Sequence, residues 1–152
     1  MTHEYGELKD IPLPDEFIDI HIQDLVRAVN AFGLRTNESC EGHFGRRPYV
    51  RPQPWVVLWL FPPLGSDGRF DESRIGEVVE KKTRLQYIVD AYNLNSPVEW
   101  ILKQGYLKPT NVASDLTELT LLQASANDLA RFIFNNVNTN PPPGWPFRSL
   151  LY

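Results

Sequence analysis

The chain has 152 residues, of which 42% are hydrophobic, 22% charged and 12% aromatic. These proportions are typical of one soluble globular domain, and they exclude a fully disordered chain or a fibrous repeat. The net charge of −4 argues against a nonspecific binder of nucleic acids or membrane surfaces, so any site for an anion must be local.

The prolines mark out the helical segments. Thirteen prolines leave three long windows without proline, each of which holds one helical pattern: 15–47, 64–96 and 110–140. In the first window, apolar residues recur between positions 18 and 32 at spacings of three and four, and Gly33 supplies a left-handed cap that ends the expected helix. Its start is ambiguous, because the isoleucines at 18, 20 and 22 also alternate as in a strand.

The other two windows predict one helix each. Between positions 75 and 92, apolar residues share one face and charged residues lie on the other, which is the most regular helical pattern in the chain. In the third window, Ser125 and Asp128 have the spacing of a capping box, and an apolar stripe continues from Leu129 to Val137. We therefore expect a third helix that begins near Ser125 and ends in an Asn-rich turn near 138.

Four segments between the helices have the composition of strands: 34–39, 55–61, 98–103 and 116–123. The segment 55–61 is apolar on both faces, with Trp55 and Trp59 on the same side. Such a strand lies in the middle of a sheet covered on both faces, or its second face belongs to a partner subunit.

The order of these elements predicts an α+β fold, with a mainly antiparallel sheet of about four strands and about three helices packed on it. We expect a single domain over residues 1–139 and a proline-rich tail over 140–152. Two roles remain open for this tail: it packs on the surface through Trp145, Phe147 and Leu150, or it binds a partner.

The sequence also predicts a cytoplasmic location. The first ten residues lack the basic start and apolar run of a signal peptide, and the single cysteine, Cys40, excludes an internal disulfide. The longest strongly apolar stretch, 55–64, is interrupted by Pro62 and Pro63 and is shorter than the roughly 20 residues of a membrane helix. We therefore expect no contact with a membrane.

The loop 39–51 has the residue types from which a reactive site is built. Cys40 and His43 are separated by two residues, so one turn of backbone can bring sulfur and imidazole together, with Glu41 as an acid-base or orienting group. Nearby cations would lower the pKa of the Cys40 thiol towards the thiolate. Cys40, Glu41 and His43 are thus the candidate catalytic residues; the alternative is a buried cysteine and a polar loop histidine without chemistry.

The same loop is rich in arginine. Arg46, Arg47 and Arg51, with Arg35 on the preceding strand, supply planar donors suited to phosphate or carboxylate, unless they form a solvated surface run. Trp55 follows directly and is the tryptophan expected to border a pocket, whereas Trp59 and Trp100 are expected in the core. The candidate ligand-binding residues are Arg35, Ser39, Gly42, Arg46, Arg47, Arg51 and Trp55.

A metal site is a second chemical possibility. Cys40, Glu41 and His43 can each ligate zinc or iron, and His21 or His3 could complete a set. The second ligand pair of a structural zinc site is missing, which leaves a catalytic site with three ligands and water. The pattern on its own assigns no metal ligand and identifies no cofactor, and for His21 a half-buried packing role is favoured.

The motif resembles known proteins. A helix ending at Gly33 is followed by the run from Ser39 to His43, SCEGH, and by a strand that begins Pro54-Trp55-Val56. Over residues 19–60 this arrangement resembles a group of small bacterial and phage-borne proteins marked by an SCEGH motif, a group without an established activity. The Ser-Cys-x-Gly-basic run is also similar to a stretch of the tRNA wybutosine-synthesising methyltransferase family, from which Glu41 and His43 depart. The resemblance implies that the motif acts as a unit and implies no substrate.

The sequence thus supports one leading hypothesis and two alternatives. The leading one is a site for an anionic ligand, a nucleotide or RNA phosphate, on the loop 39–51, with catalysis by Cys40 and His43 left open. The first alternative is a protein-interaction module or homodimer that uses the strand 55–61 and the tail. The second is a metal-binding protein. Whether the protein is an enzyme stays open.

Overall fold

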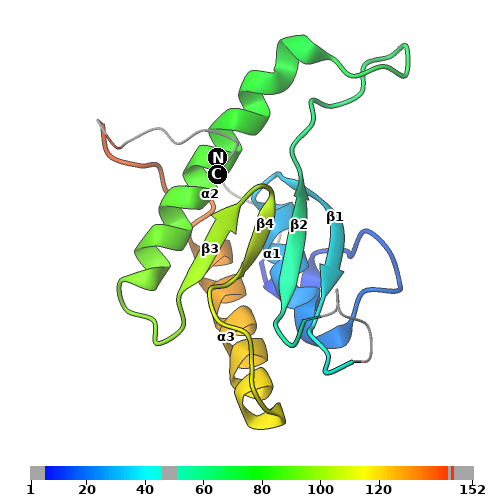
Figure 1. Cartoon of the computed structure of the whole chain (residues 1–152). Helices are drawn as coiled ribbons and strands as arrows, with labels where there is room; N and C mark the ends of the chain where they lie inside the picture. The colour runs from blue at the N-terminus through cyan, green and yellow to red at the C-terminus, as the bar shows by residue number, and fades with distance from the viewer. Residues whose placement is uncertain (1–5, 46–50, 144, 146–152) are drawn as a thin grey trace.

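The fold is α+β and is built on one four-stranded antiparallel sheet (Figure 1). It is seen in a computed structural model that describes residues 6–45, 51–143 and 145. The strands lie in the order β1 (Arg35–Cys40), β2 (Trp55–Trp59), β4 (Tyr106–Pro109) and β3 (Trp100–Lys103). The helices are α1 (Gln23–Ala31), α2 (Ile75–Asn93) and α3 (Leu116–Asn135), with short 3₁₀ helices η1 (Leu8–Asp10), η2 (Ile20–Ile22) and η3 (Glu72–Arg74).

The three helices pack on one face of the sheet, with α1 and α3 behind the strands in Figure 1 and α2 beside β3. The strand residues that join the helices in the core alternate along their strands, as a sheet with one covered face requires. They are Val56, Leu58, Trp100, Leu102 and Leu107, each at most 4% exposed. None of the helices in the described residues is long and apolar enough to cross a membrane.

Gly33 ends α1 as the sequence predicts. It has φ +98°, and the amide of Leu34 donates to the carbonyl of Val29 at 3.3 Å, which closes the helix end. The start of the helix lies later than the apolar stripe suggests, because η2 occupies residues 20–22 and α1 begins at Gln23.

The predicted strand 116–123 is wrong, because these residues form the first two turns of α3. Asp115 accepts a hydrogen bond from the amide of Glu118, and the Glu118 carboxylate accepts one from the amide of Ser114, both at 2.8 Å. Ser125 and Asp128 lie inside the helix instead of capping it. The Ser125 hydroxyl accepts a hydrogen bond from the indole of Trp100 at 2.9 Å.

The fourth strand of the sheet is β4, which the sequence analysis missed. It follows β3 through a two-residue turn in which Gln104 has φ 52° and Gly105 has φ 82°. Two consecutive residues with positive φ are typical of the tight turn that joins antiparallel strands. The Gln-Gly pair was the available signal.

The strand β2 is covered on one face only by the described part of the chain. Trp55, Val57 and Trp59 point away from the helices and are half-buried. The prediction that Trp59 fills the core is therefore wrong, whereas Trp100 is buried as expected. In the tail, Trp145 packs edge-on against Tyr87 of α2, while the predicted contacts of residues 147 and 150 lie outside the described residues.

Candidate functional site

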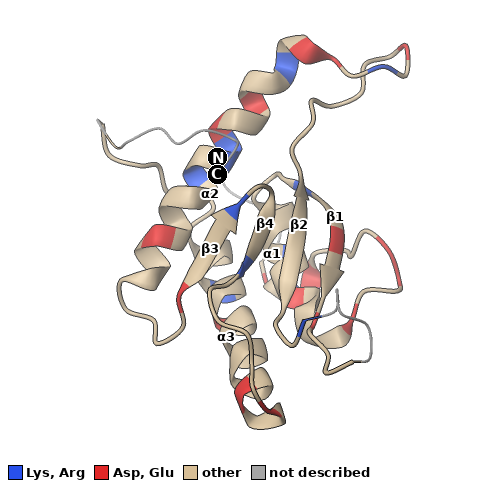
Figure 2. Ribbon diagram, viewed as in Figure 1, with Lys and Arg blue, Asp and Glu red and all other residues tan. Residues whose placement is uncertain are grey.

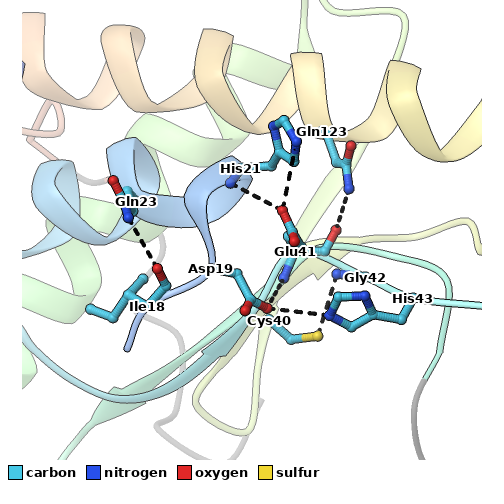
Figure 3. A network of polar contacts seen from close by, with 9 residues as sticks. All are labelled: Ile18, Asp19, His21, Gln23, Cys40, Glu41, Gly42, His43 and Gln123. Carbon is cyan, nitrogen blue, oxygen red and sulfur yellow. Dashed lines mark hydrogen bonds and ion pairs between the residues drawn. The ribbon is translucent and has the colours of Figure 1, made fainter. Parts of the chain in front are cut away.

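Three potential ligands converge where β1 ends (Figure 3). Cys40 is the last residue of β1, His43 follows it three residues later, and Asp19 precedes η2. The thiol sulfur, an imidazole nitrogen and a carboxylate oxygen all lie within 4.8 Å of one another. The fold thereby brings a residue from before α1 to the Cys-His pair that the sequence singled out.

Backbone amides hold the cluster in place. The amide of Gly42 donates to Cys40 Sγ at 3.3 Å, and the amide of Glu41 donates to Asp19 Oδ2 at 3.2 Å. The same Asp19 oxygen lies 3.3 Å from Nε2 of His43. Each of the three side chains is therefore oriented by the backbone or by another member of the cluster.

Gly42 is required by the backbone at this point. Its φ is +91°, a conformation that side-chain-bearing residues rarely adopt. A Cβ here would lie 2.8 Å from the backbone carbon of Gln53 and 2.8 Å from Leu119. The glycine thus lets the chain turn from β1 directly against the loop before β2. Its assignment as a ligand-binding residue stays a prediction.

Glu41 faces away from the Cys-His pair, as Figure 3 shows. Its Oε2 accepts a hydrogen bond from the amide of His21 at 3.1 Å, and its carbonyl accepts one from Gln123 Nε2 at 3.0 Å. The residue ties η2 and α3 to the end of β1, which suits the orienting role. His21 itself is exposed, so its predicted half-buried packing role is wrong.

The electrostatic surroundings of Cys40 are acidic. Burial raises the pKa of the thiol; the hydrogen bond from Gly42 opposes this, and the charges of Asp19 and Glu41 add to the rise. The expectation that cations lower this pKa is therefore wrong for the described residues. Without a bound cation the thiol is protonated and is a weak nucleophile near neutral pH.

The arginines do not gather around the thiol. Arg35 lies opposite Trp59 at the far end of β1, whereas Cys40 lies opposite Trp55. Arg51 is exposed, and the predictions for residues 46 and 47 lie outside the described residues. The predicted basic cluster is thus not assembled by the arginines that the structure describes.

Trp55 and Ser39 border a hollow beside the cluster. This pocket, of about 310 Å³, also contacts Ile18, the neighbour of Asp19 in sequence. The expectation that Trp55 borders a pocket is confirmed. The pocket lies along the edge of β1, and its lining includes Ile18 and Ser39, the sequence neighbours of Asp19 and Cys40.

Comparisons of the chain with models of protein families, with curated proteins and with solved structures found no match. The resemblance to SCEGH-containing proteins therefore stays a prediction. What the site can do must be inferred from its own geometry.

Asp19 is the residue of the cluster that the sequence analysis missed. A carboxylate between Ile18 and Ile20, in a run of apolar positions, was the available signal. Gln53 was missed as well: this buried side chain donates to the carbonyls of Pro109 and Asn111, both at 3.0 Å, and anchors the loop before β2.

Proposed function

We propose that the protein binds a divalent transition metal ion, with zinc as the best match, through Asp19, Cys40 and His43. The observation that carries this proposal is the convergence of their three donor atoms within 4.8 Å. Carboxylate oxygen, thiolate sulfur and imidazole nitrogen are the donor types that zinc prefers. Because the ligands come from separate segments, 19 and 40–43, such a site forms only in the folded chain.

The distance between the oxygen and nitrogen donors agrees with tetrahedral coordination. Bonds of about 2.0 to 2.1 Å from zinc to oxygen and nitrogen place two such donors about 3.3 Å apart at the tetrahedral angle. Asp19 Oδ2 and His43 Nε2 are 3.3 Å apart. Without a metal, these two atoms are within hydrogen-bonding distance of each other. Asp19 and His43 can therefore accept an ion between them with little rearrangement.

The surroundings favour a cation over an anion. Asp19 and Glu41 bring negative charge to the thiol, and the amides of Glu41 and Gly42 act as outer-sphere donors to two of the ligands. A metal ion would replace the thiol proton and be attracted by the same carboxylates that raise the pKa of the thiol. This charge pattern ranks the metal hypothesis above the anionic-ligand hypothesis.

Three protein ligands would also allow the metal to act in catalysis. Three protein ligands leave a fourth tetrahedral position for water, the arrangement of catalytic zinc sites. The His43 side chain is 49% exposed, so solvent reaches this part of the cluster. A metal-bound water there would be a nucleophile for hydrolysis, with the hollow beside Trp55 as the approach for a substrate.

The test is metal binding by matched variants. The purified protein should bind one equivalent of zinc, and cobalt in its place should give the sulfur-to-cobalt absorption band that reports a thiolate ligand. Cys40→Ser, His43→Gln and Asp19→Asn should each weaken zinc binding by at least about tenfold. His21→Gln is the control, because it removes an exposed histidine close to Glu41 but outside the cluster.

The proposal is contradicted if the purified protein binds no equivalent of zinc. It is also contradicted if the protein binds one equivalent and Cys40→Ser does not weaken that binding. Circular dichroism melting of each variant separates loss of the site from loss of the fold. The reduced thiol that the site needs agrees with the predicted cytoplasmic location. The homodimer and the partner role of the tail stay predictions.

A further inference from the structure

The sheet has a second, aromatic face that the described part of the chain leaves open. On β2, Trp55 and Trp59 point away from the helices, and Tyr106 of β4 lies beside them, paired with Val57 and 42% exposed. The rings of Trp55 and Tyr106 have centroids 6.0 Å apart at 56°. This aromatic face runs across the two central strands of the sheet.

The loop after β2 extends this face. Phe61 and Phe70 stack with centroids 5.5 Å apart, and Phe61 lies 4.9 Å from Trp59. Phe61 is 55% and Phe70 46% exposed, which is unusual for phenylalanine. A hollow of about 410 Å³ opens here, lined by Arg35, Trp59 and Phe70 together with polar side chains of β1.

Basic side chains surround the aromatic rings. Lys103 lies opposite Tyr106, Lys108 Nζ lies 5.8 Å from the centre of the Tyr106 ring, and Arg35 lies opposite Trp59. Glu38 lies opposite Val57 on the edge strand, and Asp15 lines the hollow beside Trp55 with it, so this face also has carboxylates. Figure 2 shows Lys or Arg (blue) on β3 and β4 and Asp or Glu (red) on β1. Among these described side chains, three cations outnumber the two carboxylates, on a chain of net charge −4.

We propose that this open face binds single-stranded RNA. Unpaired bases have flat π faces that stack on exposed Trp, Tyr and Phe side chains, and flanking Lys and Arg neutralise the phosphates. A duplex hides its base faces, so it cannot use the rings. The hollow beside Arg35 also contains Thr36 and Asn37, which offer hydrogen bonds to a ribose 2′-hydroxyl.

Charge argues against a second copy of this chain as the occupant. A two-fold dimer buries the same patch of both subunits, so it would bring together two patches in which cations outnumber carboxylates. RNA supplies the opposite charge. None of the three metal-ligand candidates is among the residues assigned to RNA, but Trp55 borders both sites because it lies opposite Cys40. The variants that test RNA binding therefore leave Trp55 unchanged.

The experiment measures fluorescence polarisation of labelled oligonucleotides with the full chain. Single-stranded RNA of mixed sequence should bind, more tightly than single-stranded DNA of the same sequence and much more tightly than duplex RNA. Binding should weaken as salt rises, with a log–log slope of about −0.7 for each phosphate contacted. Quenching of tryptophan fluorescence should accompany binding.

Two variants test the assigned contacts. Tyr106→Ala should weaken binding about 5- to 150-fold through loss of one stacked base. Lys103→Gln with Lys108→Gln should weaken binding and flatten the salt slope. The matched control is Lys9→Gln with Arg131→Gln, which removes the same charge from exposed positions on η1 and α3 and should leave binding unchanged.

Several outcomes would overturn the proposal. The first is no RNA binding at protein concentrations up to about 100 µM, the weak end of nonspecific association. The second is the same affinity for single-stranded DNA as for RNA. The third is a loss of binding in the control variant as large as that in the Lys103 and Lys108 variant. A dimer that becomes monomeric in Tyr106→Ala, without RNA binding, would assign the face to a second copy instead. The melting temperature of each variant, compared with that of the unchanged protein, tests whether the fold is intact.

Discussion

At the scale of single residues, Gly42 is the position on which the geometry of the metal-site candidate most depends. Its positive φ places Cys40 and His43 on either side of a sharp turn, and an added Cβ would lie 2.8 Å from the backbone carbon of Gln53. A side chain here must either strain the backbone or push the loop before β2 away from β1.

Gly42→Ala should therefore lower the free energy of unfolding by about 1 to 3 kcal/mol through strain and crowding. Urea denaturation measures the change. Gly68→Ala is the control, because Gly68 also has a positive φ, +79°, but nothing within 4 Å of the added Cβ. A loss in Gly42→Ala no larger than that in Gly68→Ala would mean that the close approach to Gln53 has no energetic consequence.

Other single residues have roles that their sequence pattern does not indicate. Ser125 has the spacing of a helix cap with Asp128, yet both act inside α3. The Ser125 hydroxyl accepts from the Trp100 indole at 2.9 Å, and Asp128 accepts from the Tyr92 hydroxyl at 2.9 Å. These bonds satisfy polar groups of large core side chains, which would otherwise be buried without partners.

At the scale of elements, α3 connects the core to the candidate site. Its buried residues follow helical spacing from its first turn to its last, and Gln123 in its middle holds the carbonyl of Glu41. The cap formed by Asp115 and Glu118 lies close in sequence to Leu119, which contacts the turn at Gly42. The start of α3 thus supports both the helix and the turn at the site.

Asp115→Ala should lower the free energy of unfolding by about 0.5 to 2 kcal/mol, because the amide of Glu118 loses its acceptor at the start of a 20-residue helix. Thermal or urea unfolding measures it. Asp71→Ala removes a comparable cap from the three-residue, exposed η3 and should have a smaller effect. Equal effects of the two substitutions would contradict this account of the α3 cap.

The two faces of β2 have different roles. Val56 and Leu58 anchor it in the core, while Trp55 and Trp59 remain available on the open face. An apolar pattern on both sides does not reveal which face the helices will cover. The packing of the helices decides it, and the uncovered face is the one we assign to RNA.

At the scale of the whole molecule, charge is unevenly distributed. Asp19 and Glu41 bring negative charge to the thiol at the end of β1, whereas Lys103 and Lys108 lie beside Tyr106. In Figure 2 the ribbon shows Lys and Arg on β3 and β4 and acidic residues on β1. A net charge of −4 conceals this separation. The molecule therefore offers one site with the character for a cation and another with the character for a polyanion.

Zinc should stabilise the whole fold, because a metal held by Asp19, Cys40 and His43 joins the segment before α1 to the end of β1. Free zinc at 100 times its dissociation constant adds about 2.7 kcal/mol, a rise in Tm of about 5 to 10 °C for a chain of this size. Differential scanning calorimetry measures it, with magnesium as the control because that ion prefers all-oxygen sites. A rise that persists in Cys40→Ser would place the zinc elsewhere.

The sequence by itself determined the α+β class, the position of α2, the cap at Gly33 and the loop that holds Cys40 and His43 together. These depend on local spacing, which the chain carries wherever it folds. The tertiary structure decided that Asp19 joins the pair, that Arg35 lies at the opposite end of β1, and which face of β2 the helices cover. Those outcomes depend on how segments distant in the chain pack against one another, and no local pattern encodes that.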